Sequence, residues 1–145
     1  MHARILRLVL PLALLAAVGG CASGSSALSG LTNNPLVSSL TSTLGVSPEQ
    51  AVGGTGAMLG YAQKALPADQ ATAVANAIPG ASDITKAAAP MLGGSSLSSL
   101  ADVQSAFSKL GMSPDTVSKF APILTDQVGK VAGPQVAGLL GGLFK

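Results

Sequence analysis

The feature that most constrains the fold of this chain is a short block of sequence that occurs twice, 66 residues apart. Residues 36–50 read LVSSLTSTLGVSPEQ and residues 102–116 read DVQSAFSKLGMSPDT, and seven of the fifteen positions are identical. Single identities are common in a chain so rich in serine, alanine and glycine, but the shared pattern Leu-Gly-(Val/Met)-Ser-Pro-acid is specific. The chain is therefore expected to build the same local structure twice.

The shared pattern predicts the end of one helix and the start of the next. Gly45 and Gly111 each follow a leucine, where a glycine in the left-handed conformation ends a helix. The serine then caps the next helix, the proline takes its first position, and the acid lies at its positive end. In the first copy Gln50 completes a capping box. The predicted structural helix caps are Ser47, Pro48, Ser113 and Pro114.

Apolar residues at helical spacing flank both copies of the block. A third helix is expected in each half, from Pro67 to Ile78 and from Pro134 to Phe144, with a short helix from Asp83 to Ala89 between the halves. No useful length of sequence alternates with the period of a strand. The predicted fold class is all-α, a small bundle of six or seven short helices built from two tandem three-helix repeats, at about residues 35–78 and 100–144.

Two parts of the predicted bundle have weak helix signals. Gly56 and Pro122 occupy equivalent positions in the two copies, so a kink or break is expected near residues 118–122. Val136 to Phe144 is the most apolar segment after the leader, yet its glycines lower helix propensity by about 1 kcal/mol each relative to alanine. This segment needs tertiary contacts to persist, and we expect it to dock on the first repeat.

Glycines spaced by four residues are a further feature of the predicted helices. Such pairs bring helices together in lipid, and they also allow close packing of short helices in a water-soluble bundle. Because no segment after the leader approaches the roughly 20 apolar residues of a membrane span, we expect close packing. The pairs are Gly56/Gly60, Gly129/Gly133 and Gly138/Gly142.

The first twenty residues have the order of features found in a secretory signal. Residues 1–7 contain two arginines and no acid, and residues 8–18 form an apolar run, LVLPLALLAAV. This run is well short of the roughly 20 residues that span a bilayer. We therefore predict a signal peptide at residues 1–20. An ordinary secretory signal without lipid attachment, or an apolar first helix of a soluble protein, is the alternative.

The end of the leader, Val18-Gly19-Gly20-Cys21, resembles the lipobox of bacterial lipoproteins. The resemblance implies signal cleavage between Gly20 and Cys21 and attachment of acyl chains such as palmitate at Cys21. At about 0.8 kcal/mol per buried methylene, more than one chain anchors a protein stably. Lipoproteins kept in the inner membrane carry aspartate where this chain has Ala22, so the resemblance implies an outer-membrane protein facing the periplasm.

The remaining chain divides into a tether and one domain. Residues 21–34 comprise the lipidated cysteine and an uncharged segment rich in serine and glycine, which is typical of a flexible linker. Residues 35–145 form the predicted helical domain.

The residues present after the leader exclude several classes of function. Six lysines balance six acids there, so no basic patch is available for nucleic acid. No histidine or arginine remains, and the only cysteine is Cys21, so a proton shuttle, a free thiolate and a guanidinium clamp are all missing. Several acids fall in expected first turns of helices, where the helix dipole accounts for them. We expect no catalytic, cofactor or metal site and no enzymatic activity.

The sequence segments LGVSPEQA and LGMSPDTVSKFAPIL resemble the VcgC/VcgE family of bacterial proteins of unknown function, and the resemblance covers roughly residues 35–145. The resemblance implies a helical fold and an envelope setting, and it brings no activity or catalytic residues.

Together these observations predict a non-enzymatic outer-membrane lipoprotein with a periplasmic helical domain used for structure or protein interaction. Its expected partners are membrane lipid through Cys21 and an envelope protein, with no nucleic acid and no metal. A lipid-binding or membrane-associating module is the alternative, and an envelope enzyme is a weaker one. An enclosed apolar cavity would favour lipid binding, and an exposed apolar patch would favour protein interaction.

Overall fold

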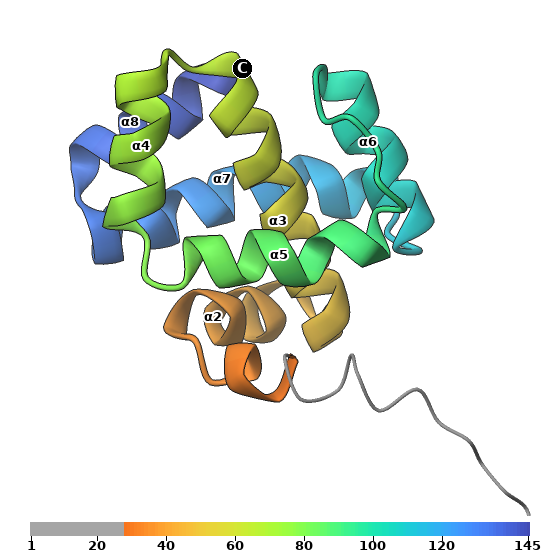
Figure 1. Ribbon diagram of the computed structural model, residues 1–145. Helices are drawn as coiled ribbons and strands as arrows, with labels where there is room; N and C mark the ends of the chain where they lie inside the picture. Colours follow the sequence, from red (N-terminus) through yellow and green to blue (C-terminus); the bar gives the residue numbers. More distant parts are fainter. Residues whose placement is uncertain (1–27) are drawn as a thin grey trace, which may run out of the picture.

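A computed structural model describes residues 28–145, which form helices joined by short turns with no strand among them (Figure 1). The predicted all-α fold is therefore confirmed. A helical turn at residues 28–32 comes first. The helices that follow are α2 (Pro35–Leu44), α3 (Pro48–Ala65), α4 (Ala68–Ala77), α5 (Ala81–Met91), α6 (Leu100–Lys109), α7 (Pro114–Ala132) and α8 (Pro134–Leu143).

The repeated sequence block forms the turns before α3 and α7. Ser47 is the N-cap of α3: its Oγ accepts from the Gln50 amide at 3.2 Å, and its own amide donates to Gln50 Oε1 at 3.0 Å. In the second copy Ser113 Oγ accepts from the Thr116 amide at 3.3 Å. The two turns also meet, because Gln50 Nε2 donates to the carbonyl of Leu110 at 2.9 Å. Both leading glycines have left-handed backbones, with φ of 66° at Gly45 and 73° at Gly111.

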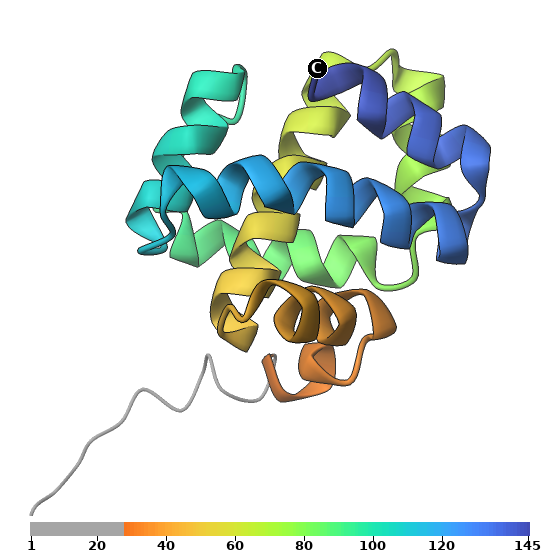
Figure 2. The same ribbon diagram turned by 180° about the vertical axis from the view of Figure 1, so that it is seen from behind.

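Helix α3 lies at the centre of the bundle. Helix α5 runs across one side of it and α7 across the other, as the two opposite views show (Figures 1 and 2). Helix α2 packs below, against α3 and α7, while α6 lies to one side of α3 and the α4 and α8 pair to the other side. The bundle thus has one inner helix enclosed by the rest.

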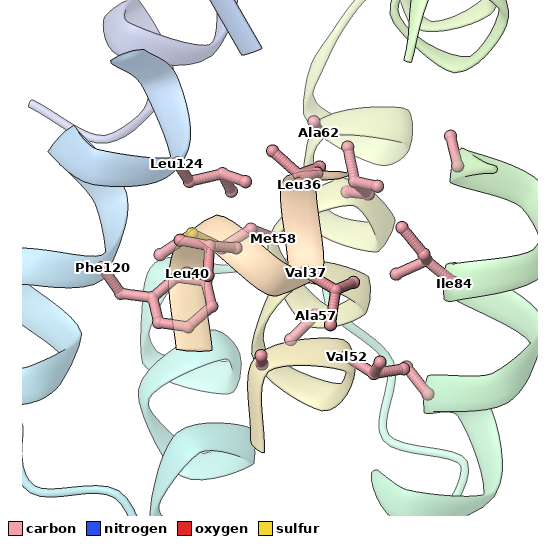
Figure 3. Close-up of a cluster of buried hydrophobic side chains, with 14 of the residues drawn as sticks. Leu36, Val37, Leu40, Val52, Ala57, Met58, Ala62, Ile84, Phe120 and Leu124 are labelled. Carbon is pink, nitrogen blue, oxygen red and sulfur yellow. The ribbon is translucent and has the colours of Figure 1, made fainter. Parts of the chain in front are cut away.

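A single hydrophobic core joins these helices (Figure 3). Phe107 of α6 and Phe120 of α7 are fully buried and meet edge to face, with ring centroids 5.0 Å apart. Buried apolar side chains from α2, α3, α5 and α7 converge on the same region. They include Leu36, Val37, Leu40, Val52, Ala57, Met58, Ile84 and Leu124.

The break expected near residues 118–122 is absent, because α7 runs through this segment as one helix with Pro122 inside it. An interior proline removes one helical hydrogen bond. Pro122 lies on the exposed side of α7, where water can reach the freed carbonyl, while Phe120 and Leu124 on the opposite face are fully buried. Burial of that face keeps the helix continuous.

Part of the flexible linker predicted for residues 21–34 is helical instead. Residues 28–32, assigned to the flexible linker, are helical, and Leu31 is 7% exposed and belongs to the core. Leu28 lies three residues earlier, on the same helical face, and packs against that core. Cys21, the signal peptide and the rest of the tether lie outside the described residues.

Helix α8 docks differently from the prediction. It packs chiefly on α7, its neighbour in sequence, and only its smaller contacts reach α3 and α4 in the first half. Gly133, with φ of 91°, connects α7 directly to α8, so the two helices are held together by a very short turn. Val136 and Leu140 are buried, and these side chains secure the weak terminal helix.

Candidate functional site

An open groove of mixed apolar and polar surface between α6 and α7 is the best candidate for a functional site. It has a volume of about 310 Å³. Its walls come from α6 and the first half of α7, with one residue from α3 and one from the end of α8. We call it the α6–α7 groove, and its lining is Met58, Leu100, Val103, Gln104, Val117, Ser118, Ala121, Pro122 and Phe144.

The groove exists because α6 packs more closely on α3 than on α7. Val103 holds the base of α6 in the core, whereas Leu100, one turn earlier, stays 39% exposed at the rim. Met58 of α3 is only 2% exposed and lies beneath. On the other side, the Phe144 ring is held by Tyr61 of α3, with centroids 6.0 Å apart.

The lining of the groove contains no charged residue. Gln104 and Ser118 are exposed, and Gln104 supplies an amide for hydrogen bonding. The Ser118 hydroxyl already donates to the Pro114 carbonyl at 3.1 Å, so only its oxygen is left to accept a further bond. The remaining lining side chains are apolar. The surface is thus built for contact with an uncharged apolar group that also carries a few hydrogen-bonding atoms.

Asp102 lies on α6 between lining residues, but hydrogen bonding already accounts for its carboxylate. Its Oδ2 accepts from the amides of Ser98 and Ser99, each at 3.0 Å, and Ser99 Oγ accepts from the Asp102 amide. The hydrogen bonds from Ser98 and Ser99 lower the pKa of Asp102. This acid therefore stays ionised at neutral pH and completes the capping box of α6, whose N-cap is Ser99.

Across residues 28–145, no three side chains of histidine, cysteine, aspartate or glutamate gather closely enough to form a metal site. In that same part of the chain, no helix has the length and apolar character needed to cross a membrane.

The residues selected from sequence do not form this groove. Gly20 and Cys21 lie outside the described residues, and the caps Ser47, Pro48, Ser113 and Pro114 lie at the two turns. Sequence reasoning missed the groove because Leu100 and Val117 are apolar residues at helical spacing, a pattern that also predicts core positions. The sequence did contain one indication of the groove. Ser118 and Pro122 lie beside these apolar residues on α7, and serine and proline are seldom found in a core.

Comparison with known proteins identifies the family but no activity. No curated protein and no solved structure matches the chain. A family described as "Protein of unknown function VcgC/VcgE" matches residues 16–143, which confirms the resemblance carried by the repeated block. Because the match spans nearly the whole sequence, the chain belongs to the VcgC/VcgE family of proteins of unknown function (DUF2780).

Proposed function

We propose that this protein is a non-enzymatic lipoprotein of the outer membrane, and that its helical domain works in the periplasm by contacting another protein through the α6–α7 groove. The observation that supports this most is the groove itself, which is open to solvent, has no charged lining residue and combines apolar side chains with the polar groups of Gln104 and Ser118. Exposed apolar surface with polar atoms at its edge is typical of protein-interaction sites.

Binding of free lipid is the alternative, and the form of the groove favours protein contact. Lipid carriers enclose an acyl chain and withdraw it from water. In this groove Leu100, Gln104 and Ser118 are all exposed, so an acyl chain lying there would remain partly in water. A protein partner would cover the same apolar surface and would bond to the Gln104 amide.

The proposed anchor would orient the domain with its groove away from the membrane. The first described residues lie next to α2, and the C-terminus and α6 lie at the opposite end of the bundle in both views (Figures 1 and 2). Seven residues from Cys21 to Leu28 span at most about 25 Å. The α2 end would therefore face the bilayer, and the groove would face the periplasm.

Lipid attachment is tested by growing cells with a labelled fatty acid. The protein should take up the label, and Cys21→Ser should abolish both labelling and cleavage after Gly20. Ser25→Ala, a change in the adjacent tether, is the control and should leave both unchanged. An unmodified Cys21 in the mass spectrum of the mature protein would contradict the proposal.

Protein contact is tested by placing a photo-crosslinking amino acid at Gln104 in intact cells. The control position is Ser105, which is also exposed on α6 but does not line the groove. Irradiation should give a discrete protein adduct from position 104 and none from position 105. Identical adducts at both positions, or none at position 104, would refute the groove as the contact site.

A further inference from the structure

The α6–α7 groove has a counterpart in the first half of the molecule. The aligned sequence blocks are 66 residues apart, and the helices of the two halves follow the same order with nearly the same offset. Subtracting 66 from the number of a groove residue therefore gives its counterpart. Asn34 and Ser38, the counterparts of Leu100 and Gln104, are not buried. The other six counterparts are buried: Val37, Ala51, Val52, Thr55, Gly56 and Ile78.

Helix α5 packs along α3 and covers the part of this counterpart surface that α3 supplies around Val52 and Gly56. From α5, Ile84 points toward Val37, and Val52 points toward α5 (Figure 3). A Cβ atom on Gly56 would overlap the Cβ of Ala88, so the two helices pack nearly backbone to backbone. The place that α5 occupies beside α3 corresponds to the open groove beside α7.

The segment that leads into α5 also has a counterpart at the groove. Ile78 is followed by Pro79 and Gly80, and Asn34 fixes this turn by donating from Nδ2 to the Pro79 carbonyl at 2.9 Å. The counterpart of Ile78 is Phe144, which forms one wall of the groove. A helix that entered beside Phe144 would thus lie along α7 as α5 lies along α3.

The chemistry of the groove indicates how such a helix would bind. Where α3 has Val52 and Gly56, α7 has Ser118 and Pro122. Both α7 residues are exposed, and Ser118 is polar. A helix could not approach α7 as closely as α5 approaches α3, and the surface tolerates water when uncovered. This combination is typical of a reversible interface.

We propose that the groove binds an amphipathic helix of a partner protein in trans, in the place that α5 fills in the first half. The helix would present a short apolar stripe resembling the buried stripe of α5, Ala81, Ile84 and Ala88. The stripe would carry no charge, because the groove has no charged residue to pair with it. This inference rests on the proposed function of the groove and specifies the kind of partner.

The first experiment supplies the helix within the same chain. In the full chain, residues 79–92 are appended after Phe144 in place of Lys145, which reproduces the junction that follows Ile78. A filled groove should raise the midpoint of thermal unfolding by about 3–6 °C. The matched extension carries Ile84→Asp in its appended copy and should give no rise. An equal rise for both extensions, or none for either, overturns the inference.

The second experiment supplies the helix in trans. A fluorescent peptide of residues 79–92 is titrated with the full chain in lipid nanodiscs, and binding is followed by polarisation. Ser118→Glu, which places a charge in the groove, should weaken binding at least tenfold. Ser105→Glu, an identical change outside the groove, should alter it by less than twofold. Equal effects of the two variants, or no saturable binding, overturn the inference.

Other occupants give different results. A dimer of the chain that Ser118→Glu dissociates, in sedimentation without peptide, would identify a second copy as the occupant and overturn the inference. Saturable binding of a fluorescent fatty acid without peptide binding would also overturn it and would identify an acyl chain. If the helix probes fail while crosslinking at Gln104 still captures a protein, the proposed function stands and only the helical partner is refuted.

Discussion

Helices α3 and α7 begin with the same Ser-Pro-acid signal and have nearly the same length, yet they are stabilised in opposite ways. Residues 51–59 of α3 are buried on every side. On α7 burial is confined to one face, and Lys119 and Asp126 are exposed on the other. The comparison shows that the shared sequence block determines where a helix begins, while the following residues determine how far neighbouring helices enclose it.

Glycine is the physical reason for the enclosure of α3. A Cβ on Gly54 would lie 2.9 Å from Phe120 Cζ, and one on Gly60 would lie 2.8 Å from Leu97 Cδ1. Neighbouring helices therefore pack into the space that side chains would occupy. On α7 the contact at Gly129 is an ordinary one, 3.4 Å to the Cβ of Ala137. Truncating a buried side chain should thus lower the free energy of unfolding most on α7. Adding a methyl group at a glycine should lower it most on α3.

The largest effect is expected from Phe120→Ala. Phe120 is fully buried, meets Phe107 edge to face, and fills the space beside Gly54. Truncation should lower the free energy of unfolding by about 4 kcal/mol, measured by denaturant titration with circular dichroism. Val131→Ala, on the same helix but 37% exposed, should change it by less than about 0.5 kcal/mol. Similar losses for both variants would disprove the one-sided description of α7.

The second effect is the cost of one added methyl group on α3. In Gly56→Ala the new Cβ would overlap Ala88 and lie 3.1 Å from the Ile84 carbonyl oxygen. We expect a loss of about 2–3 kcal/mol despite the better helix propensity of alanine. The double variant Gly56→Ala/Ala88→Gly should recover most of it.

Gly138→Ala provides the matched control for that prediction. Nothing lies within 4 Å of the position its Cβ would take, so the variant should gain up to about 1 kcal/mol from helix propensity. Of the three glycine pairs predicted to pack closely, Gly56/Gly60 does so and Gly138/Gly142 does not. A gain at Gly56 equal to that at Gly138 would mean that α3 and α5 are not in close contact.

A buried hydroxyl on α3 gives the third prediction. Thr55 is fully buried, and its Oγ1 has no hydrogen-bond partner among the described residues. Thr55→Val removes this unsatisfied group at nearly constant volume, so the free energy of unfolding should rise by about 1–2 kcal/mol. Thr125→Val on α7 should give no gain, because Thr125 Oγ1 already donates to the Ala121 carbonyl at 2.8 Å. No gain for Thr55→Val would show that the Thr55 hydroxyl finds a partner in solution.

Local signals in the sequence predicted the helix starts and the helical faces well. Serine before proline, and glycine after leucine, act through hydrogen bonds and backbone angles within a few residues, so no knowledge of the tertiary structure is needed. The same holds for the stripe of α7, where Phe120, Leu124 and Val128 are buried as their spacing requires.

Features that depend on contacts between helices were not predictable in this way. The helix expected at residues 83–89 extends over Ala81–Met91 and covers α3, because glycines on another helix allow it to approach. The groove also depends on contacts between helices. Leu100 shares a stripe with Val103, yet Leu100 is exposed because α6 packs more closely on α3 than on α7.

The smallest predicted losses of stability distinguish the two copies of the shared block. Ser47 Oγ and Ser113 Oγ each accept one backbone hydrogen bond, but only in the first copy does the residue three positions later also bond back to the serine amide. That residue is Gln50, which further donates to the Leu110 carbonyl and thereby joins the turns.

Ser47→Ala should lower the free energy of unfolding by about 1 kcal/mol and Ser113→Ala by about 0.5 kcal/mol. Gln50→Ala should cost as much as Ser47→Ala, since it removes both a cap and the link between the turns. Denaturant titration of the three variants measures these differences, and a larger loss for Ser113→Ala than for Ser47→Ala would contradict the ordering.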